Sequence, residues 1–158
     1  MSVLLNIVLV EPEIPHNTGA IGRVCVGLGA RLHLVKPMGF RLDSAAVRRC
    51  GLDYWEHLDL RVHRTWASFL EDERPENLFL LSAKGTRSIY ECRFIAGSFL
   101  VFGSETLGFP ASFYETYRDR LYRIPMPGPH ARTINLANAV AIAAYEAFRQ
   151  TQPQMSQD

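Results

Sequence analysis

Residues 99–108 read FLVFGSETLG, a run of four apolar residues that stops at a glycine and continues as a loop ending in another glycine. A short apolar run of this kind is typical of a strand that is buried on both faces of a parallel sheet. Because glycine has no side chain, its backbone can approach a ligand closely. We therefore expect a buried strand at 98–102 that leads into a ligand-binding loop.

Two other segments have the same organisation. An apolar strand at 78–82 leads into Ala-Lys-Gly-Thr at 83–86, and another at 121–124 leads into Pro-Met-Pro-Gly-Pro at 125–129. Ligands of open parallel sheets bind beyond the carboxyl ends of the strands. The three loops are therefore expected to line one pocket that suits a flat heterocycle held by backbone hydrogen bonds. The alternative is that they are only tight turns.

The rest of the chain alternates between apolar strands and helical patterns. Strands are expected at 4–10, 31–36 and 61–63, and helices at 17–29, 44–50, 65–73, just after Pro110 and at 134–149. Asn17 supplies a capped start for the first helix, and Gly29 is its expected stop. This alternation predicts an α/β fold, a parallel sheet with flanking helices on both faces. Residues 1–150 are expected to form a single domain and residues 151–158 a flexible C-terminal tail.

The composition is that of an ordinary globular protein, with 158 residues, 47% hydrophobic and 21% charged. No apolar run approaches the ~20 residues that a membrane-spanning helix needs, and the first residues lack the features of a secretory signal. A cytoplasmic protein without membrane contact is therefore expected.

The basic residues are mostly arginine. The net charge is +1, but fifteen of the 17 basic residues are arginine, and four of these lie at 118–132 beside a single acid, Asp119. The planar guanidinium suits phosphate recognition, so this cluster is a candidate for binding phosphate groups. The alternative is that the arginine bias reflects genome composition, which explains the total better than the local cluster.

Several enzyme classes are disfavoured by missing motifs. No Gly-x-Gly-x-x-Gly follows the first strand, and the chain has neither a P-loop nor a Gly-x-Ser-x-Gly elbow. The three cysteines have no disulfide or zinc spacing and are interpreted as reduced and structural: Cys25, Cys50 and Cys92. The histidines form no metal-spaced pair, so no metal site is predicted: His16, His33, His57, His63 and His130.

The last predicted helix is apolar on two sides. One stripe consists of Leu136, Val140, Ala143 and Ala147, and the other of Ala137, Ala141, Tyr145 and Phe148. A helix of this kind must be buried on more than one side. The protein's own sheet can cover one stripe, whereas the other requires a further helix or a partner subunit. A homodimer is therefore expected.

Three sequence blocks occur together and in order: NTGAIGR at 17–23, FGSETLG at 102–108, and IPM at 124–126 followed by TINLANAV at 133–140. With these blocks the chain resembles the SPOUT class of S-adenosylmethionine-dependent RNA methyltransferases. Residues 5–15, 51–54 and 145–150 resemble minimal members of the class, which methylate the ribose 2′-oxygen of the wobble nucleotide of tRNA, a cytidine or modified uridine at position 34. The resemblance spans about residues 5–150 and leaves no appended RNA-binding domain.

The resemblance implies a deep C-terminal trefoil knot, a homodimer, and S-adenosyl-L-methionine bent into the knotted loops. Periodicity alone predicts an unknotted sheet, because true knots are rare. The matching cofactor positions are Leu81, Gly103, Glu105, Ile124, Thr133 and Asn135. Catalysis is assigned to Arg23 and Asn17, and contact with the tRNA anticodon loop to Arg132 and Tyr145. The chain departs from the family at 131–135, which reads ARTIN where close relatives commonly read SRSMN. Thr133 keeps a hydroxyl, whereas Ala131 does not.

Arg23 is a poor general base, because a guanidinium has a pKa above about 12 and no free lone pair. Our hypothesis is that it binds the adjacent phosphate and favours oxyanion character on the attacking oxygen. Asn17 has a structural alternative, orienting its loop, and Glu105 has one as an anchor of a motif arginine or of the knot backbone. Tyr145 stacks on a base or, as we favour, fills the dimer interface. Three other functions stay open: ribose methylation at another tRNA or rRNA site, a non-catalytic RNA-binding knot module, and an unorthodox nicotinamide-dependent oxidoreductase.

Overall fold

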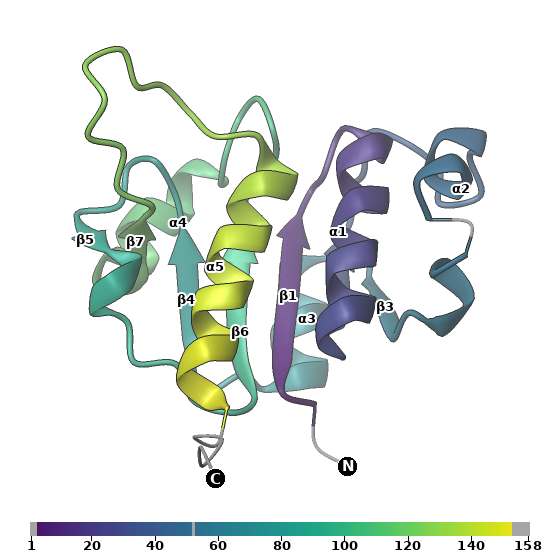
Figure 1. Ribbon diagram of the computed structural model, residues 1–158, viewed down its shortest axis with the longest axis horizontal. Coiled ribbons are helices and arrows are strands. Elements are labelled where there is room, and N and C mark those ends of the chain that lie inside the picture. The colour runs from purple at the N-terminus through teal and green to yellow at the C-terminus, as the bar shows by residue number, and fades with distance from the viewer. Residues whose placement is uncertain (1–2, 52, 153–158) are drawn as a thin grey trace, which may run out of the picture.

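A seven-stranded sheet organises the computed structural model, which describes residues 3–51 and 53–152 (Figure 1). The strand order is β3-β2-β1-β6-β4-β7-β5, and every pairing is parallel. The expected parallel α/β architecture is thereby confirmed. The strands are β1 Leu5–Val10, β2 Arg31–Val35, β3 Leu60–His63, β4 Leu78–Leu81, β5 Arg87–Ser88, β6 Ser98–Phe102 and β7 Leu121–Arg123.

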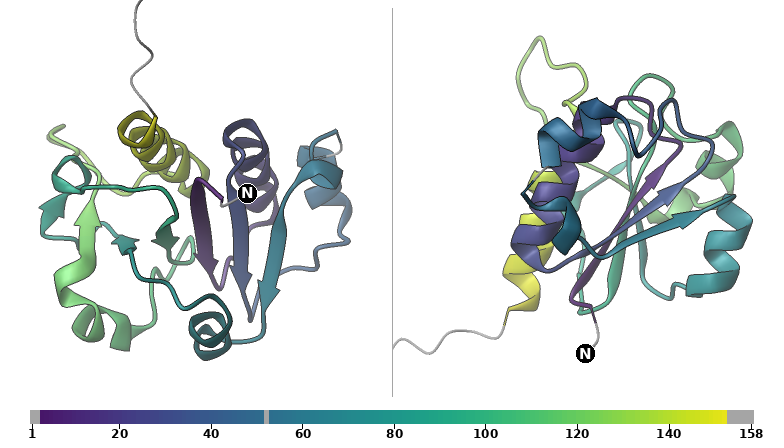
Figure 2. Two further views of the ribbon diagram at one scale, coloured as in Figure 1. Left: turned by 90° about the horizontal axis from the view of Figure 1, so that it is seen from below. Right: turned by 90° about the vertical axis from the view of Figure 1, so that its right-hand side faces the viewer.

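Helices cover both faces of this sheet. Helices α1 and α5 lie side by side on one face, and α3 and α4 lie on the other (Figures 1 and 2). The helices are α1 Pro15–Leu28, α2 Ala45–Gly51, α3 Trp66–Glu73, α4 Ala111–Thr116 and α5 Leu136–Thr151, with short 3-10 turns at Trp55–His57, Ile89–Glu91 and Arg118–Arg120. None of the helices in the described part of the chain is long and apolar enough to cross a lipid bilayer.

The core has two layers because the central strands are buried on both faces. Side chains alternate along β1, so Ile7 and Leu9 face α1 and α5, whereas Val8 and Val10 face α3 and α4. All six residues of β1 are buried. Complete burial of an aliphatic side chain stabilises the fold by about 1.5–3 kcal/mol. The near-continuous apolar runs of the sequence therefore reflect two-sided burial, as predicted.

Some element boundaries differ from the prediction. Helix α1 begins at Pro15, and Asn17 does not cap it; the N-cap is Ile14, which has no side-chain capping bond. Proline is favoured in this first turn because its missing N–H would be unpaired there anyway. The predicted stop at Gly29 is confirmed, since this residue takes the left-handed conformation with φ 65°. Helix α5 continues to Thr151, and residues 153–158 of the predicted tail lie outside the described residues.

Candidate functional site

A pocket of about 370 Å³ lies beyond the carboxyl ends of β4, β6 and β7. This is the edge of the sheet at which the three glycine- and proline-rich loops were expected to meet, and each loop contributes to the lining. The volume is within the range of sites for small organic ligands. The lining consists chiefly of residues 81–84, 102–109 and 133–136, together with Ile14, Asn17, Tyr114, Ile124, Met126 and Ala139.

One wall of the pocket is the loop that follows β6, and it closes on itself. The N–H of Ser104 donates to the carbonyl of Gly108 at 2.9 Å, and the N–H of Gly108 donates back to Ser104 at 3.0 Å. A Cβ at Gly103 would lie 2.3 Å from the carbonyl carbon of Gly108, so only glycine fits at this position. Gly108 itself has φ +70°, a conformation that side chains rarely adopt. The loop is therefore shaped before any ligand binds.

Glu105 ties this loop to the start of α1. Its carboxylate accepts hydrogen bonds from the backbone N–H groups of Glu13 at 2.7 Å and Ile14 at 3.0 Å. It also accepts one from the Asn17 side-chain amide at 3.4 Å, and the Asn135 amide donates to Asn17 Oδ1 at 3.1 Å. A carboxylate is favourable at a helix N-terminus, where unpaired N–H groups carry partial positive charge. Glu105 thus anchors the backbone segment just before α1, and not an arginine, and the capping role expected of Asn17 is wrong.

A second hydrogen-bonded contact links the loop after β6 to the segment that leads into α1. The Thr106 hydroxyl lies 2.7 Å from both carboxylate oxygens of Glu13. This hydrogen bond holds the pKa of the Glu13 carboxyl below its ordinary value. The loop after β6, the start of α1 and the start of α5 consequently form one bonded unit around the pocket.

The predicted cofactor residues come together. All six line the pocket, although they lie on four separate segments of the sequence: Leu81, Gly103, Glu105, Ile124, Thr133 and Asn135. Lys84, from the loop expected to line the pocket, does line it, and its ammonium nitrogen lies 4.6 Å from the ring centroid of Tyr114. Tyr114 also lines the pocket, and no feature of the sequence predicted this.

Of the residues predicted to act in catalysis or RNA contact, only Asn17 lines this pocket, whereas Arg23, Arg132 and Tyr145 lie outside it. Arg23 is exposed on α1, with its guanidinium 4.6 Å from the ring centroid of Tyr54. It shares a shallow depression with Tyr145 of α5, and the depression is lined by neither Asn17 nor any cofactor position. Arg132 is exposed in the long loop between β7 and α5, which projects beyond the sheet (Figure 1). A single chain therefore does not assemble the whole predicted site.

Residues 4–145 match the SpoU rRNA Methylase family. The chain belongs to this family. A relative from Saccharophagus degradans is 48% identical over 148 residues, covering 93% of this chain and 96% of its own. One from Escherichia coli K12 is 47% identical over 148 residues, with coverage of 93% and 94%. Both are named tRNA (cytidine(34)-2'-O)-methyltransferase.

Solved structures agree with this membership. A structure described as giving insight into 2-OH methylation of C/U34 on tRNA is 49% identical, covers 92% of this chain and 95% of its own, and superposes with a TM-score of 0.85. The SpoU methyltransferase AviRb from Streptomyces viridochromogenes, in complex with AdoMet, is 25% identical and covers 95% of this chain and 58% of its own, with a TM-score of 0.80. The predicted resemblance to RNA methyltransferases of this type is confirmed.

Proposed function

We propose that this SpoU methylase transfers a methyl group from S-adenosyl-L-methionine to the ribose 2′-oxygen of nucleotide 34, a cytidine or modified uridine, in the anticodon loop of tRNA. The observation that carries the proposal is the convergence of all six predicted cofactor residues on one pocket. Support comes from relatives of nearly equal length that are named for this reaction. The family makes the chain a methyltransferase, which removes the oxidoreductase and non-catalytic alternatives.

The pocket fits the proposed cofactor. Leu81 and Ile124 line the pocket with aliphatic side chains that would pack against an adenine ring, and the preformed loop at Gly103 offers backbone groups without side-chain obstruction. The Thr133 hydroxyl would supply a polar contact. When bound, S-adenosyl-L-methionine supplies an electrophilic methyl group. The chain's own part is to hold this methyl in line with the ribose oxygen and to exclude water, and such positioning accounts for much of the rate.

We also propose that the C-terminal segment forms a deep trefoil knot. β7 lies between β4 and β5, so the chain returns into a sheet position that the β4–β5 segment flanks. Contact between these segments is close: the N–H of Ser82 donates to the carbonyl of Tyr122 at 2.9 Å. A Cβ at Gly85 would lie 2.4 Å from the same carbonyl carbon. The tight packing supports a threaded arrangement.

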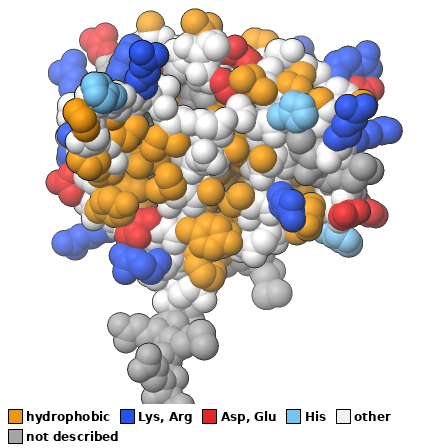
Figure 3. Space-filling view, turned by 45° about the horizontal axis from the view of Figure 1, so that its top comes forward, with side chains coloured by type: hydrophobic (Ala, Val, Ile, Leu, Met, Phe, Trp, Pro, Cys, Tyr) orange, Lys and Arg blue, Asp and Glu red, His pale blue; other side chains and the backbone are white. Residues whose placement is uncertain are grey.

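Arg23 lies outside the pocket of its own chain. This position supports a homodimer, in which two chains together complete the site. Arg23 and Tyr145 lie on the face formed by α1 and α5, where exposed apolar side chains gather between charged residues (Figure 3). Tyr145 is 52% exposed and Ile142 38%. In the proposed dimer this face packs against a second copy, and Arg23 acts at a site to which both chains contribute. It binds the phosphate beside the target ribose, and the exposed Arg132 contacts the anticodon loop. With tRNA as substrate, we place the enzyme in the cytoplasm.

The test is a methyl-transfer assay with purified protein, labelled S-adenosyl-L-methionine, and either bulk tRNA lacking this modification or ribosomal RNA. We expect incorporation into tRNA only. Incorporation into ribosomal RNA alone would replace the proposed substrate. Cofactor binding by calorimetry, measured in parallel, separates the failure of the pocket from the failure of the substrate assignment.

A further inference from the structure

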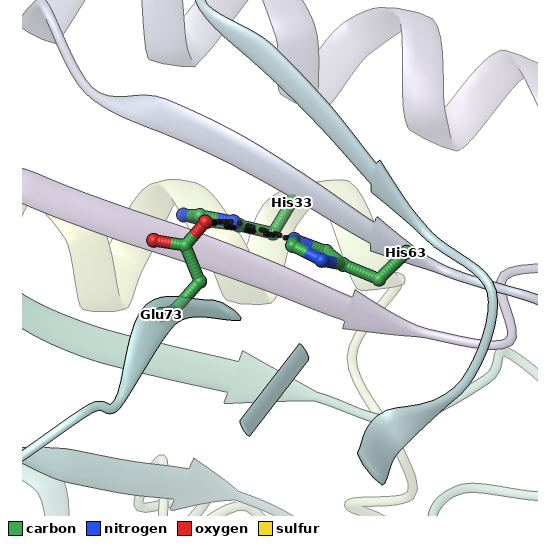
Figure 4. Close-up of side chains that lie close together, drawn as sticks. All are labelled: His33, His63 and Glu73. Atoms are coloured by element: carbon green, nitrogen blue, oxygen red, sulfur yellow. Dashed lines mark hydrogen bonds and ion pairs between the residues drawn. The ribbon is translucent and has the colours of Figure 1, made fainter. Parts of the chain in front are cut away.

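A second cluster of chemically capable side chains lies far from the cofactor positions, on the α3 face of the sheet. His33 comes from the middle of β2, His63 from the end of β3 and Glu73 from the end of α3 (Figure 4). Their side chains are 0%, 4% and 8% exposed. Phe69 packs edge-on against both imidazole rings, with centroid distances of 5.6 and 5.2 Å. Polar groups buried at this level require partners.

Three atoms of the cluster, one from each side chain, lie close together. His33 Nδ1 lies 3.1 Å from His63 Nε2, which is a hydrogen-bond distance. Glu73 Oε1 lies 3.8 Å from the first nitrogen and 3.9 Å from the second, which is too long for a hydrogen bond to either. Given these three distances, one point in the plane of the two nitrogens and the oxygen lies about 2.1 Å from each of the three atoms. Zinc binds imidazole nitrogen and carboxylate oxygen at about 2.0–2.2 Å.

The outer nitrogen of each ring faces an oxygen acceptor. His33 Nε2 is 2.9 Å from Asn6 Oδ1, and the Asn6 amide nitrogen donates to the carbonyl of Gly97 at 3.3 Å. Asn6 Oδ1 is therefore the acceptor, so the His33 proton is on Nε2 and the lone pair on Nδ1 points to the cluster. Without an ion, His63 Nε2–H donates to that lone pair; with an ion bound, the proton moves to His63 Nδ1, which lies 3.5 Å from a carboxylate oxygen of Asp72. Histidines that bind metals almost always donate their other N–H to a carbonyl or carboxylate in this way.

We propose that His33 Nδ1, His63 Nε2 and Glu73 Oε1 bind one zinc ion. Two imidazoles with one carboxylate suit a borderline cation such as Zn²⁺, whereas Mg²⁺ and Ca²⁺ prefer oxygen ligands alone. β3 is an edge strand of the sheet, so the ion ties this edge to β2 and α3. None of the three ligands lines the pocket, so the proposed ion has no part in methyl transfer, and its fourth position is left for a water molecule. It was missed in the sequence because its ligands are brought together only by strand pairing and the packing of α3.

The proposal predicts a specific effect of Arg61 on zinc affinity. Its guanidinium donates to Glu73 Oε1 at 2.7 Å, so it competes with an ion for the same oxygen and places a like charge beside it. The Arg61 side chain is 45% exposed and can turn into solvent. Its replacement by a neutral residue is expected to strengthen zinc binding. A cluster held only by hydrogen bonds and the ion pair has no reason to show this gain.

The test uses tag-free full-length protein, first treated with a chelator, in calorimetric titrations with Zn²⁺ and in absorption titrations with Co²⁺. One ion per chain is expected. His63→Gln and Glu73→Gln should each weaken zinc binding by tenfold or more, and Arg61→Gln should strengthen it by about threefold or more. His57→Gln, a change at an exposed histidine outside the cluster, is the matched control and should bind like the wild type.

Absence of stoichiometric zinc binding by the wild type would overturn the proposal, and so would unchanged affinity in both ligand variants. Circular dichroism checks that the variants fold. Should His63→Gln or Glu73→Gln unfold, the Co²⁺ spectrum of the wild type decides: ligand-field bands without a thiolate charge-transfer band are expected, because no proposed ligand is sulfur. A thiolate band would place the ion at a cysteine and refute the assignment. No change in affinity for Arg61→Gln would equally contradict it.

Discussion

Replacement of Gly103 by alanine is the sharpest perturbation of the pocket, because it adds one carbon atom at the tightest backbone contact. The new Cβ would lie 2.3 Å from the carbonyl carbon of Gly108 and 2.6 Å from its oxygen. An ordinary contact begins near 3.4 Å, so the two sides of the loop, at Gly103 and at Gly108, must separate by about 1 Å. That displacement removes the two hydrogen bonds between Ser104 and Gly108, now 2.9 and 3.0 Å long.

The loss of two such bonds costs about 1–3 kcal/mol. If the cofactor must restore the loop in order to bind, its affinity falls by about 10- to 100-fold, since 1.4 kcal/mol corresponds to tenfold. Calorimetric titration with S-adenosyl-L-methionine measures this directly. Gly128→Ala is the matched control, because a Cβ there meets nothing within 4 Å. An affinity unchanged in Gly103→Ala would refute the assignment of this loop to the cofactor.

Three further perturbations probe other parts of the account. Arg23→Ala should lower turnover by at least 100-fold and change cofactor affinity less than twofold, because Arg23 lies outside the pocket; comparable losses in both quantities would contradict its role. Glu105→Gln removes the charge and one acceptor from the start of α1 and should lower the free energy of unfolding by about 1–2 kcal/mol, measured in urea; an unchanged urea midpoint would argue against the anchor. Burial raises the pKa of Cys25 and Cys92 to about 12, so in a Cys50→Ser background both should stay protonated and resist iodoacetamide at pH 8 until urea unfolds the chain. Because this pKa lies above the unfolded value near 9, the two thiols should lower stability as the pH rises beyond 9; rapid alkylation of the native protein would show that they are accessible.

The α/β architecture could be predicted from the sequence because a strand that is buried on both faces consists of consecutive apolar residues. Continuous apolar runs such as Leu78–Leu81 and residues 99–102 are typical of a central parallel strand, and the loops after them lie at the binding edge of the sheet. The pocket location could therefore be predicted from pattern alone. The identities of its lining residues came from the family resemblance, which transfers positions that periodicity cannot supply.

Other features depend on contacts between distant segments, and these leave no local pattern. β5 has two residues, too few to show any periodicity. Glu105 holds the backbone before α1 from 91 residues away in the sequence, whereas the sequence pattern placed the helix start at a local cap, Asn17. The His33–His63–Glu73 cluster was not predicted for the same reason: its two histidines are 30 residues apart and show no metal-ligand spacing in the sequence. The position of Arg23 outside the pocket likewise became visible only once α1 was packed on the sheet.

The most direct test of the central claim is the location of the transferred methyl group. Purified enzyme, S-adenosyl-L-methionine and an unmodified tRNA with cytidine at position 34 are incubated, and the nuclease fragments are sequenced by mass spectrometry. A single added methyl on the ribose of nucleotide 34, with resistance of the adjoining phosphodiester to alkali, is the predicted result. A methyl on a base, or on the ribose of another nucleotide, would contradict the account.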